Sequence, residues 1–125
     1  MRYIKTNRLA RLLKRSEYLR VKQRGTSVAK PGLVIQAVLG TNDSSFRYPR
    51  VGFTVSKRVG NAVKRNRARR RLKSIASDVL PKEGFQAWDY VFIGRLVTLD
   101  RPYDLLLEDA RAALRKIHQK PFKKE

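Results

Sequence analysis

The stretch VGFTVSKRVGNAVKRNRARRRLK, residues Val51–Lys73, joins a strand-like run to a strongly basic helix. At its start, Val51, Phe53 and Val55 alternate with small or polar residues. This period of two predicts a strand over residues 48–56 with one buried face. The alternation also favours core packing over base stacking for Phe53. An element of this kind needs a second layer to cover its apolar face.

A long helix should begin near Ala62, after the break at Gly60 and Asn61, and end at Pro81, which cannot continue a helix. Its apolar residues recur at helical spacing and predict one buried stripe: Ala68, Leu72, Ile75, Ala76 and Val79. At about 100° per residue, the opposite side carries polar and basic residues: Asn66, Arg70 and Lys73, flanked by Arg67 and Arg69. Arg65 and Arg71 fall at the edge of the stripe, where their stems can be buried.

The charge on this helix indicates a polyanionic partner. Nine of the 17 residues 57–73 are Lys or Arg, and residues 44–77 contain no acid. The whole chain of 125 residues has a net charge of +20. Such a density of like charge opposes folding unless a polyanion neutralises it. A solvated surface helix would mix signs instead, so a nucleic-acid backbone is favoured over a membrane surface.

Two details of the basic stretch each have two interpretations. The turn before the helix could cradle a phosphate against the helix N-terminus, or it could be a plain strand-to-helix turn; its candidate residues are Lys57, Gly60, Asn61 and Lys64. Asn66 could bind a base edge or a sugar hydroxyl, or it could fill a surface position. The spacing leaves both questions open.

The rest of the chain predicts a single domain. We expect a basic arm over residues 1–14, a domain over residues 15–119 and a charged tail over residues 120–125. Within the domain we expect a helix over residues 16–22 that ends at a left-handed Gly25, and strands over residues 33–39 and 88–96, the latter central and buried on both faces. A last helix follows Pro102 and should bury a stripe: Leu106, Ala110, Ala113, Leu114 and Ile117. This order predicts an α+β fold, an α/β sandwich with a small mixed sheet and packed helices.

The composition excludes several classes of protein. The sequence has no cysteine, which excludes disulfides and thiolate zinc sites and fits a cytoplasmic location. No segment has the roughly 18 apolar residues of a membrane span. The N-terminus is no secretory signal, although a mitochondrial transit peptide stays open because the segment is basic and free of acid.

Catalysis by the polypeptide is poorly supported. The carboxylates are scattered without metal-site spacing, and no nucleophile motif occurs. His118, the single histidine, should lie near a helix C-terminus as a partner of the helix dipole rather than act as a general base. We therefore expect neither catalytic residues nor a metal site in the protein. Trp88 should be core or core rim, and Tyr18 could equally stack a base or pack.

At this point the residues resemble a known family. Arg65-Asn66-Arg67 is similar to the RNR signature of the bacterial ribonuclease P protein component, and residues 51–58 resemble the strand before it. Residues 16–18, 24–27 and 89–93 and the closing helix over residues 99–117 also match, so the resemblance covers about residues 8–118. It implies an α/β sandwich shared with a domain of a small-subunit ribosomal protein, including a left-handed crossover. It also implies a role in 5′ maturation of precursor tRNA, in which the RNA subunit holds Mg²⁺ and performs the hydrolysis.

The resemblance also implies two binding surfaces and no obligate protein partner. The RNA subunit would be bound by Arg65, Asn66, Arg67, Arg69, Arg70 and Lys73. The 5′ leader of precursor tRNA would be bound by Tyr18, Lys22, Val34, Gln36 and Arg58. The family often has aromatic residues where this chain has Lys22 and Gln36. We therefore expect more electrostatic and hydrogen-bonding contact to the leader, and a weaker base preference.

Two rival functions remain on the residues alone. A ribosomal or RNA-chaperone-type protein would carry similar charge, but usually with longer basic tails. An autonomous nuclease would need an acid/base pair, which this sequence does not offer.

Overall fold

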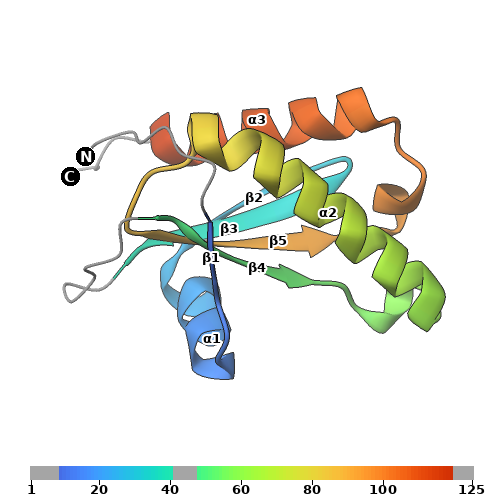
Figure 1. The fold of residues 1–125 in the computed structure, drawn as a ribbon, viewed down its shortest axis with the longest axis horizontal. Helices are drawn as coiled ribbons and strands as arrows, with labels where there is room; N and C mark the ends of the chain where they lie inside the picture. Colours follow the sequence, from blue (N-terminus) through green and yellow to red (C-terminus); the bar gives the residue numbers. More distant parts are fainter. Residues whose placement is uncertain (1–8, 41–47, 120–125) are drawn as a thin grey trace.

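The computed structural model describes residues 9–40 and 48–119. Within them lies one mixed five-stranded sheet in the order β1-β4-β5-β3-β2, with helices on both faces (Figure 1). The strands are β1 (Ala10–Arg11), β2 (Thr26–Lys30), β3 (Leu33–Leu39), β4 (Arg50–Thr54) and β5 (Trp88–Gly94). The helices are α1 (Arg15–Arg24), α2 (Ala62–Glu83) and α3 (Tyr103–Gln119), with short 3₁₀ turns η1 (Lys57–Val59) and η2 (Leu96–Leu99). The α+β fold predicted from the sequence is confirmed.

The central position predicted for β5 is correct. It pairs antiparallel with β3, with Phe92 opposite Ile35, and parallel with β4, with Phe92 opposite Phe53. Both faces of β5 are largely buried, which explains its continuous apolar run. The helix α2 connects the parallel neighbours β4 and β5, so it forms the crossover of the fold.

The two faces of the sheet differ in how they are covered. The helices α2 and α3 lie together on one face and build the main core with it, whereas α1 lies alone on the other (Figure 1). All five residues of each expected stripe on α2 and α3 are buried. On the α1 face a small cluster forms around Leu12, Val21 and Val91, and Tyr18, Val38 and Ile93 pack at its edge. Because α1 is short, this face is less completely covered than the other.

Some local expectations are wrong. Gly25 ends α1 with φ −91° rather than in a left-handed conformation. Glycine is needed there for space, because an added Cβ would lie 2.4 Å from the carbonyl oxygen of Ala37 on β3. Pro81 does not end α2, which continues to Glu83. In the last turn proline removes a single i→i−4 bond, and Pro81 is buried there.

Two strands of the sheet were not predicted from the sequence. One is β2, which pairs with β3 as a hairpin, with Val28 opposite Ile35. The other is β1, which adds residues of the expected N-terminal arm to the sheet edge beside β4. Leu12, directly after β1, is 4% exposed. Part of the arm therefore belongs to the packed domain, while residues 1–8 and the tail over residues 120–125 lie outside the described residues.

His118 is a packing residue rather than a cationic partner of the α3 terminus. Its ring stacks on Phe85 with centroids 4.0 Å apart, and its Nε2 lies 2.7 Å from the hydroxyl of Tyr90. Burial lowers the pKa of His118 to about 4, so the ring is neutral at pH 7. Trp88 packs edge-on against the same ring, in agreement with its expected place at the core rim. No helix in the described ranges is long and apolar enough to cross a membrane.

Candidate nucleic-acid interface

The N-terminus of α2 is built by two residues that the sequence analysis singled out. Asn61 caps the helix, and its side-chain oxygen accepts a hydrogen bond of 3.0 Å from the backbone N–H of Lys64. Gly60 has φ +143°, a conformation that other residues rarely adopt, and its N–H donates to the carbonyl of Lys57. The structure thus brings together all four residues of the expected phosphate-binding turn. The first turn of α2 contains no acidic residue, so nothing offsets the positive helix end.

Behind this turn, the outward side of α2 carries a ridge of basic residues, here called the α2 ridge: Arg65, Asn66, Arg67, Arg69, Arg70 and Lys73. Most of them are exposed, and Arg65 and Arg69 are half-buried. Within the described part of the chain, Arg65, Arg70 and Lys73 make no ion pair and no side-chain hydrogen bond. Arg67 approaches Asp100 at 3.8 Å, but both side chains are exposed, so the pair contributes little. The ridge therefore presents several cations that the protein itself does not neutralise.

Asn66 lies on the ridge, exposed, and its side-chain oxygen accepts a hydrogen bond of 3.1 Å from Arg69. This contact fixes which end of the amide points toward Arg69, and it leaves the amide nitrogen available. Arg71, which the sequence placed at the edge of the stripe, has a structural task instead. Its guanidinium donates to the backbone carbonyls of Leu99 and Arg101, and so ties α2 to the segment that leads into α3.

The candidate leader-binding residues lie mostly on the α1 face. Val34 and Gln36 occupy alternate positions of β3 and are half-buried, while their neighbours in sequence point into the main core. Tyr18 of α1 lies above β4, because an added Cβ at Gly52 would be 2.5 Å from its Cζ and hydroxyl. Lys22 is exposed four residues further along α1, on the same side of the helix. Arg58 is exposed in η1, between β4 and α2.

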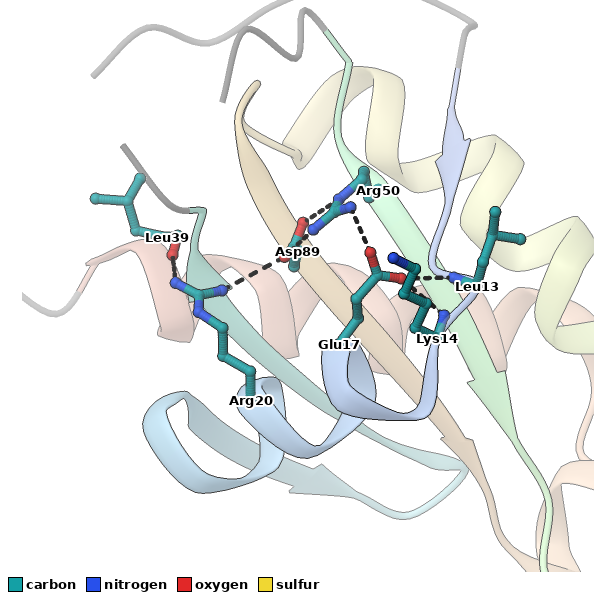
Figure 2. A network of polar contacts seen from close by, with 7 residues as sticks. All are labelled: Leu13, Lys14, Glu17, Arg20, Leu39, Arg50 and Asp89. Carbon is teal, nitrogen blue, oxygen red and sulfur yellow. Dashed lines mark hydrogen bonds and ion pairs between the residues drawn. The ribbon is translucent and has the colours of Figure 1, made fainter. Parts of the chain in front are cut away.

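A polar network fixes α1 to the sheet beside these residues, as Figure 2 shows. Arg50 of β4 donates to both carboxylate oxygens of Asp89 at 2.9 and 2.8 Å, and to Glu17 of α1 at 2.9 Å. Arg20 of α1 lies 3.5 Å from Asp89 and donates to the carbonyl of Leu39 at 2.7 Å. We call Glu17, Arg20, Arg50 and Asp89 the α1 network. It connects one helix to the ends of three strands.

Burial and charge set the chemistry of the α1 network. The side chain of Asp89 is 1% exposed, so its charge depends on the guanidinium groups that face it. Burial opposes ionisation of Glu17, but hydrogen bonds from the backbone N–H of Lys14 and Leu13 and the charge of Arg50 outweigh it and lower the pKa of Glu17. Hydrogen bonds to Asp89 raise the pKa of Arg50 against the effect of burial. Glu17 and Arg50 are therefore both charged near neutral pH.

Sequence reasoning did not identify the α1 network. One signal was present: Asp89 stands inside a run that is otherwise apolar and was expected to be buried on both faces. A carboxylate in such a place requires a cationic partner. The sequence could not show that the partners are Arg50, 39 residues away, and Arg20, 69 residues away.

The described residues contain no group of three or more His, Asp or Glu side chains arranged to hold a metal ion. Several carboxylates are instead engaged with arginines, as in the bond of 2.7 Å between Arg101 and Asp109. The residues that the structure describes thus do not form a carboxylate cluster of the kind that holds magnesium. What the arrangement offers chemically is a cationic surface and a partly covered sheet face, both suited to binding.

Comparison with known proteins identifies the family of the chain. The model of the family described as Ribonuclease P matches residues 6–118. The ribonuclease P protein component of Paramagnetospirillum magneticum is 50% identical over 111 residues, which cover 88% of this chain and 84% of that protein. That of Gluconacetobacter diazotrophicus is 49% identical over 110 residues, covering 88% and 92%. Among solved structures, the RNase P protein of Staphylococcus aureus superimposes with a TM-score of 0.67 at 26% identity, covering 85% of this chain and 93% of that one.

Proposed function

The chain belongs to the ribonuclease P protein family, and we propose that it is the protein subunit of a ribonuclease P that removes the 5′ leader of precursor tRNA. In this role the α2 ridge binds the RNA subunit, and the α1 face of the sheet binds the leader. Hydrolysis takes place in the RNA subunit, which holds the required Mg²⁺. The product is the mature 5′ end of the tRNA.

The observation that carries this proposal is the α2 ridge. It contains cations that have no ion-pair partner among the described residues, on a helix whose other side is buried in the main core. Arginine is suited to this task because its guanidinium binds phosphate with two parallel hydrogen bonds and also stacks on bases. The family match supports an RNA as the binding partner, and it argues against the ribosomal or RNA-chaperone alternative.

The leader is assigned to the α1 face because this face combines half-buried apolar positions with polar groups at its edge. Val34 and Gln36 line the open part of the sheet, and Tyr18 lies over Gly52 with its ring held in place. A single strand can lie on such a surface, whereas a duplex exposes too little of its bases to use it. Lys22 adds charge, and Gln36 adds hydrogen bonds. We expect this combination to favour contact to the backbone over selection of particular bases.

The contribution of the protein to the reaction is positional and electrostatic. By binding the leader and the RNA subunit together, it offsets the repulsion between their phosphates. It thereby raises the affinity for precursor over product, because the product has no leader. The chain supplies no acid, base or nucleophile to the reacting bond. In this proposal the Mg²⁺ ions are bound by the RNA subunit.

Cleavage assays with separate components test the proposal. Precursor tRNA is incubated with the protein alone, with the RNA subunit alone and with both, at low Mg²⁺. Cleavage that occurs mainly in the mixture is expected, because the protein adds binding and not chemistry. Cleavage by the protein alone would contradict the proposal and revive the autonomous nuclease.

The salt dependence of binding tests the electrostatic part. If about six phosphates are neutralised, the logarithm of the affinity for the RNA should fall against the logarithm of salt with a slope of about −4 to −5. Equilibrium binding between low and moderate salt measures this slope. A nearly flat response would be incompatible with binding through the α2 ridge.

A further inference from the structure

A groove lies where the outward side of α2 meets the first turn of α3. It consists of two adjoining hollows with volumes of about 370 and 450 Å³, both lined by Arg70, Ser74 and Tyr103. The smaller hollow extends toward Asp100 and Arg101. We call the two hollows together the Tyr103 groove. It is continuous with the α2 ridge, because Arg70 belongs to both.

Tyr103 is held in a defined place between the two hollows. It is the first residue of α3, is 38% exposed, and donates a hydrogen bond of 2.6 Å from its hydroxyl to Asp78 of α2. Burial and the neighbouring Asp78 raise the pKa of Tyr103 to about 12, so the hydroxyl stays protonated and keeps this bond. An aromatic ring that is fixed before binding loses little entropy when a flat ligand packs on it.

Some cations of the groove are bound to other groups of the protein, and others are not. Arg71 and Arg101 are bound to backbone carbonyls and to Asp109, respectively. Arg70 and Lys73 are exposed and have no ion pair or side-chain hydrogen bond in the part of the chain that the structure describes. A ligand with a phosphate would therefore find its charge partners at Arg70 and Lys73.

Two carboxylates distinguish the Tyr103 groove from a simple phosphate-binding surface. Asp78 lines the larger hollow and Asp100 the smaller one. Each repels phosphate, but each can accept hydrogen bonds from an amino group of a base. The groove thus combines an aromatic ring, cations on the side of the ridge and acceptors at both ends. These are the features with which proteins bind a base that has left its stack.

We propose that the Tyr103 groove binds an unpaired nucleotide of the RNA subunit, with its base against Tyr103 and its phosphate at Arg70 and Lys73. This inference rests on the proposed function, since it concerns the same partner. It adds a site on α3 to an interface that α2 alone would otherwise form. Each of the two hollows is large enough for a single base. A paired base in an A-form helix could not reach the ring of Tyr103.

Binding of the full-length protein to the RNA subunit, without tRNA and over a series of salt concentrations, tests the inference. Tyr103→Ala and Tyr103→Leu should each weaken binding by about 5- to 150-fold, the range expected for one stacked base. The slope against salt should not change, since no charge is removed. Tyr103→Phe keeps the ring and should bind like the wild type, although it lacks the bond to Asp78. Thermal unfolding of each variant shows whether it is folded. If Tyr103→Ala is not folded, Tyr103→Leu, which retains more of the packing, serves as the test.

A pair of lysine variants provides the matched control for charge. Lys73→Ala should reduce the magnitude of the salt slope by about 0.7 to 0.9, as expected when one phosphate contact is lost. Lys116→Ala removes the same charge from an exposed position in the last turn of α3 and should leave the slope unchanged.

The outcomes separate the inference from the proposed function. If the wild type binds the RNA subunit but Tyr103→Ala and Tyr103→Leu bind within twofold of it, the inference is wrong and the proposed function stands. Equal losses in Tyr103→Phe and Tyr103→Leu would also overturn it, because the tyrosine would then act through Asp78 as a tether of α3. A wild type that did not bind the RNA subunit would overturn both.

Discussion

The α1 network and the α2 ridge both contain arginines, but those of the network have carboxylate partners and most of those of the ridge do not. Arg20 and Arg50 face the buried carboxylate of Asp89, and Arg50 also faces Glu17. Arg65 and Arg70 make no ion pair among the described residues, although Asp78 and Asp100 line the same groove as Arg70. Position in the chain does not explain the difference, because Arg50 also belongs to residues 44–77, which contain no acid. The fold brings Glu17 and Asp89 from other elements to Arg50. An arginine paired inside the protein stabilises the fold, whereas one left unpaired on a rigid surface is available to a polyanion.

The largest effect should follow from breaking the α1 network at its buried centre. Asp89→Asn removes the charge that Arg50 and Arg20 face, and leaves Arg50 partly buried without a full partner. We expect a loss of about 3–5 kcal/mol in the free energy of unfolding, measured by urea denaturation. Folded protein should still bind the RNA subunit, because the α2 ridge is unchanged.

Asp109→Asn is the matched control, since Asp109 is also buried against an arginine, but on the other face of the sheet. Both variants should be destabilised, and Asp89→Asn alone should also lose selectivity for precursor over mature tRNA, because α1 carries Tyr18. A loss below about 1 kcal/mol for Asp89→Asn would show that the α1 network resembles a surface ion pair.

Charge reversal on the α2 ridge should weaken binding of the RNA subunit and leave the stability of the fold intact. Arg65→Glu with Arg70→Glu should weaken binding of the RNA subunit by about 3 kcal/mol or more, at about 1.5 kcal/mol for each charge-assisted bond that is lost. The free energy of unfolding should stay the same or rise, because self-repulsion within the helix decreases. Binding titrations and urea denaturation measure the two quantities.

The control for this reversal is Lys82→Glu with Lys116→Glu, which changes the net charge equally at exposed positions away from the ridge. If both double variants lost affinity to the same extent, net charge rather than the α2 ridge would account for binding.

Gly52→Ala, on the α1 side, should cause a smaller loss of stability than Asp89→Asn. The added methyl group would lie 2.5 Å from the ring of Tyr18, which must then move away from β4. Overpacking of this kind costs about 1–3 kcal/mol, and the displaced ring should reduce selectivity for precursor tRNA without changing binding of the RNA subunit. Gly94→Ala serves as the control, since its Cβ would meet Val55 at 3.2 Å and points toward the main core. Unchanged selectivity in Gly52→Ala would separate Tyr18 from leader binding.

Acid should affect the fold before it affects the ridge, because guanidinium groups do not titrate in this range. The folded-state pKa of His118 lies at about 4, below its ordinary value of 6.5. Protonation therefore favours the unfolded chain, and stability that is complete above pH 6.5 is lost as the pH falls toward 4. We expect a loss of about 2 kcal/mol from this residue, allowing for its partial exposure.

His118→Phe should abolish this part of the pH dependence and leave the part due to Glu17. The lowered pKa of Glu17 means that its contribution is present above the ordinary value of 4.5 and disappears as the pH falls through the lowered folded-state pKa. Thermal unfolding at a series of pH values measures both. An unchanged profile in His118→Phe would assign the acid sensitivity to the α1 network.

Much of the α2 side could be predicted because its signals are local. The spacing of Leu72, Ile75 and Val79 fixes which side of the helix is buried, and that in turn fixes where Arg70 and Lys73 point. The turn at Gly60 and Asn61 could be recognised for the same reason. The bounds of β3 were also predicted correctly, because a continuous β-branched and aliphatic run is a strong signal over a short distance.

The α1 side was predicted poorly because its contacts join distant parts of the chain. Nothing near Gly25 reveals that β3 passes within contact distance of it, so its role was misassigned. Arg50 looks like one more basic residue in a basic chain until β5 is placed beside β4. Tyr103 likewise became a candidate only when α3 was seen to begin against α2.

The sequence by itself determined the α+β class, the buried stripes and the cationic side of α2, because periodicity and charge act over a few residues along one element. Only the tertiary structure decided which arginines are neutralised and which remain available. That distinction depends on carboxylates contributed by other elements, and the strength of each pairing depends on distance and burial rather than on position in the chain.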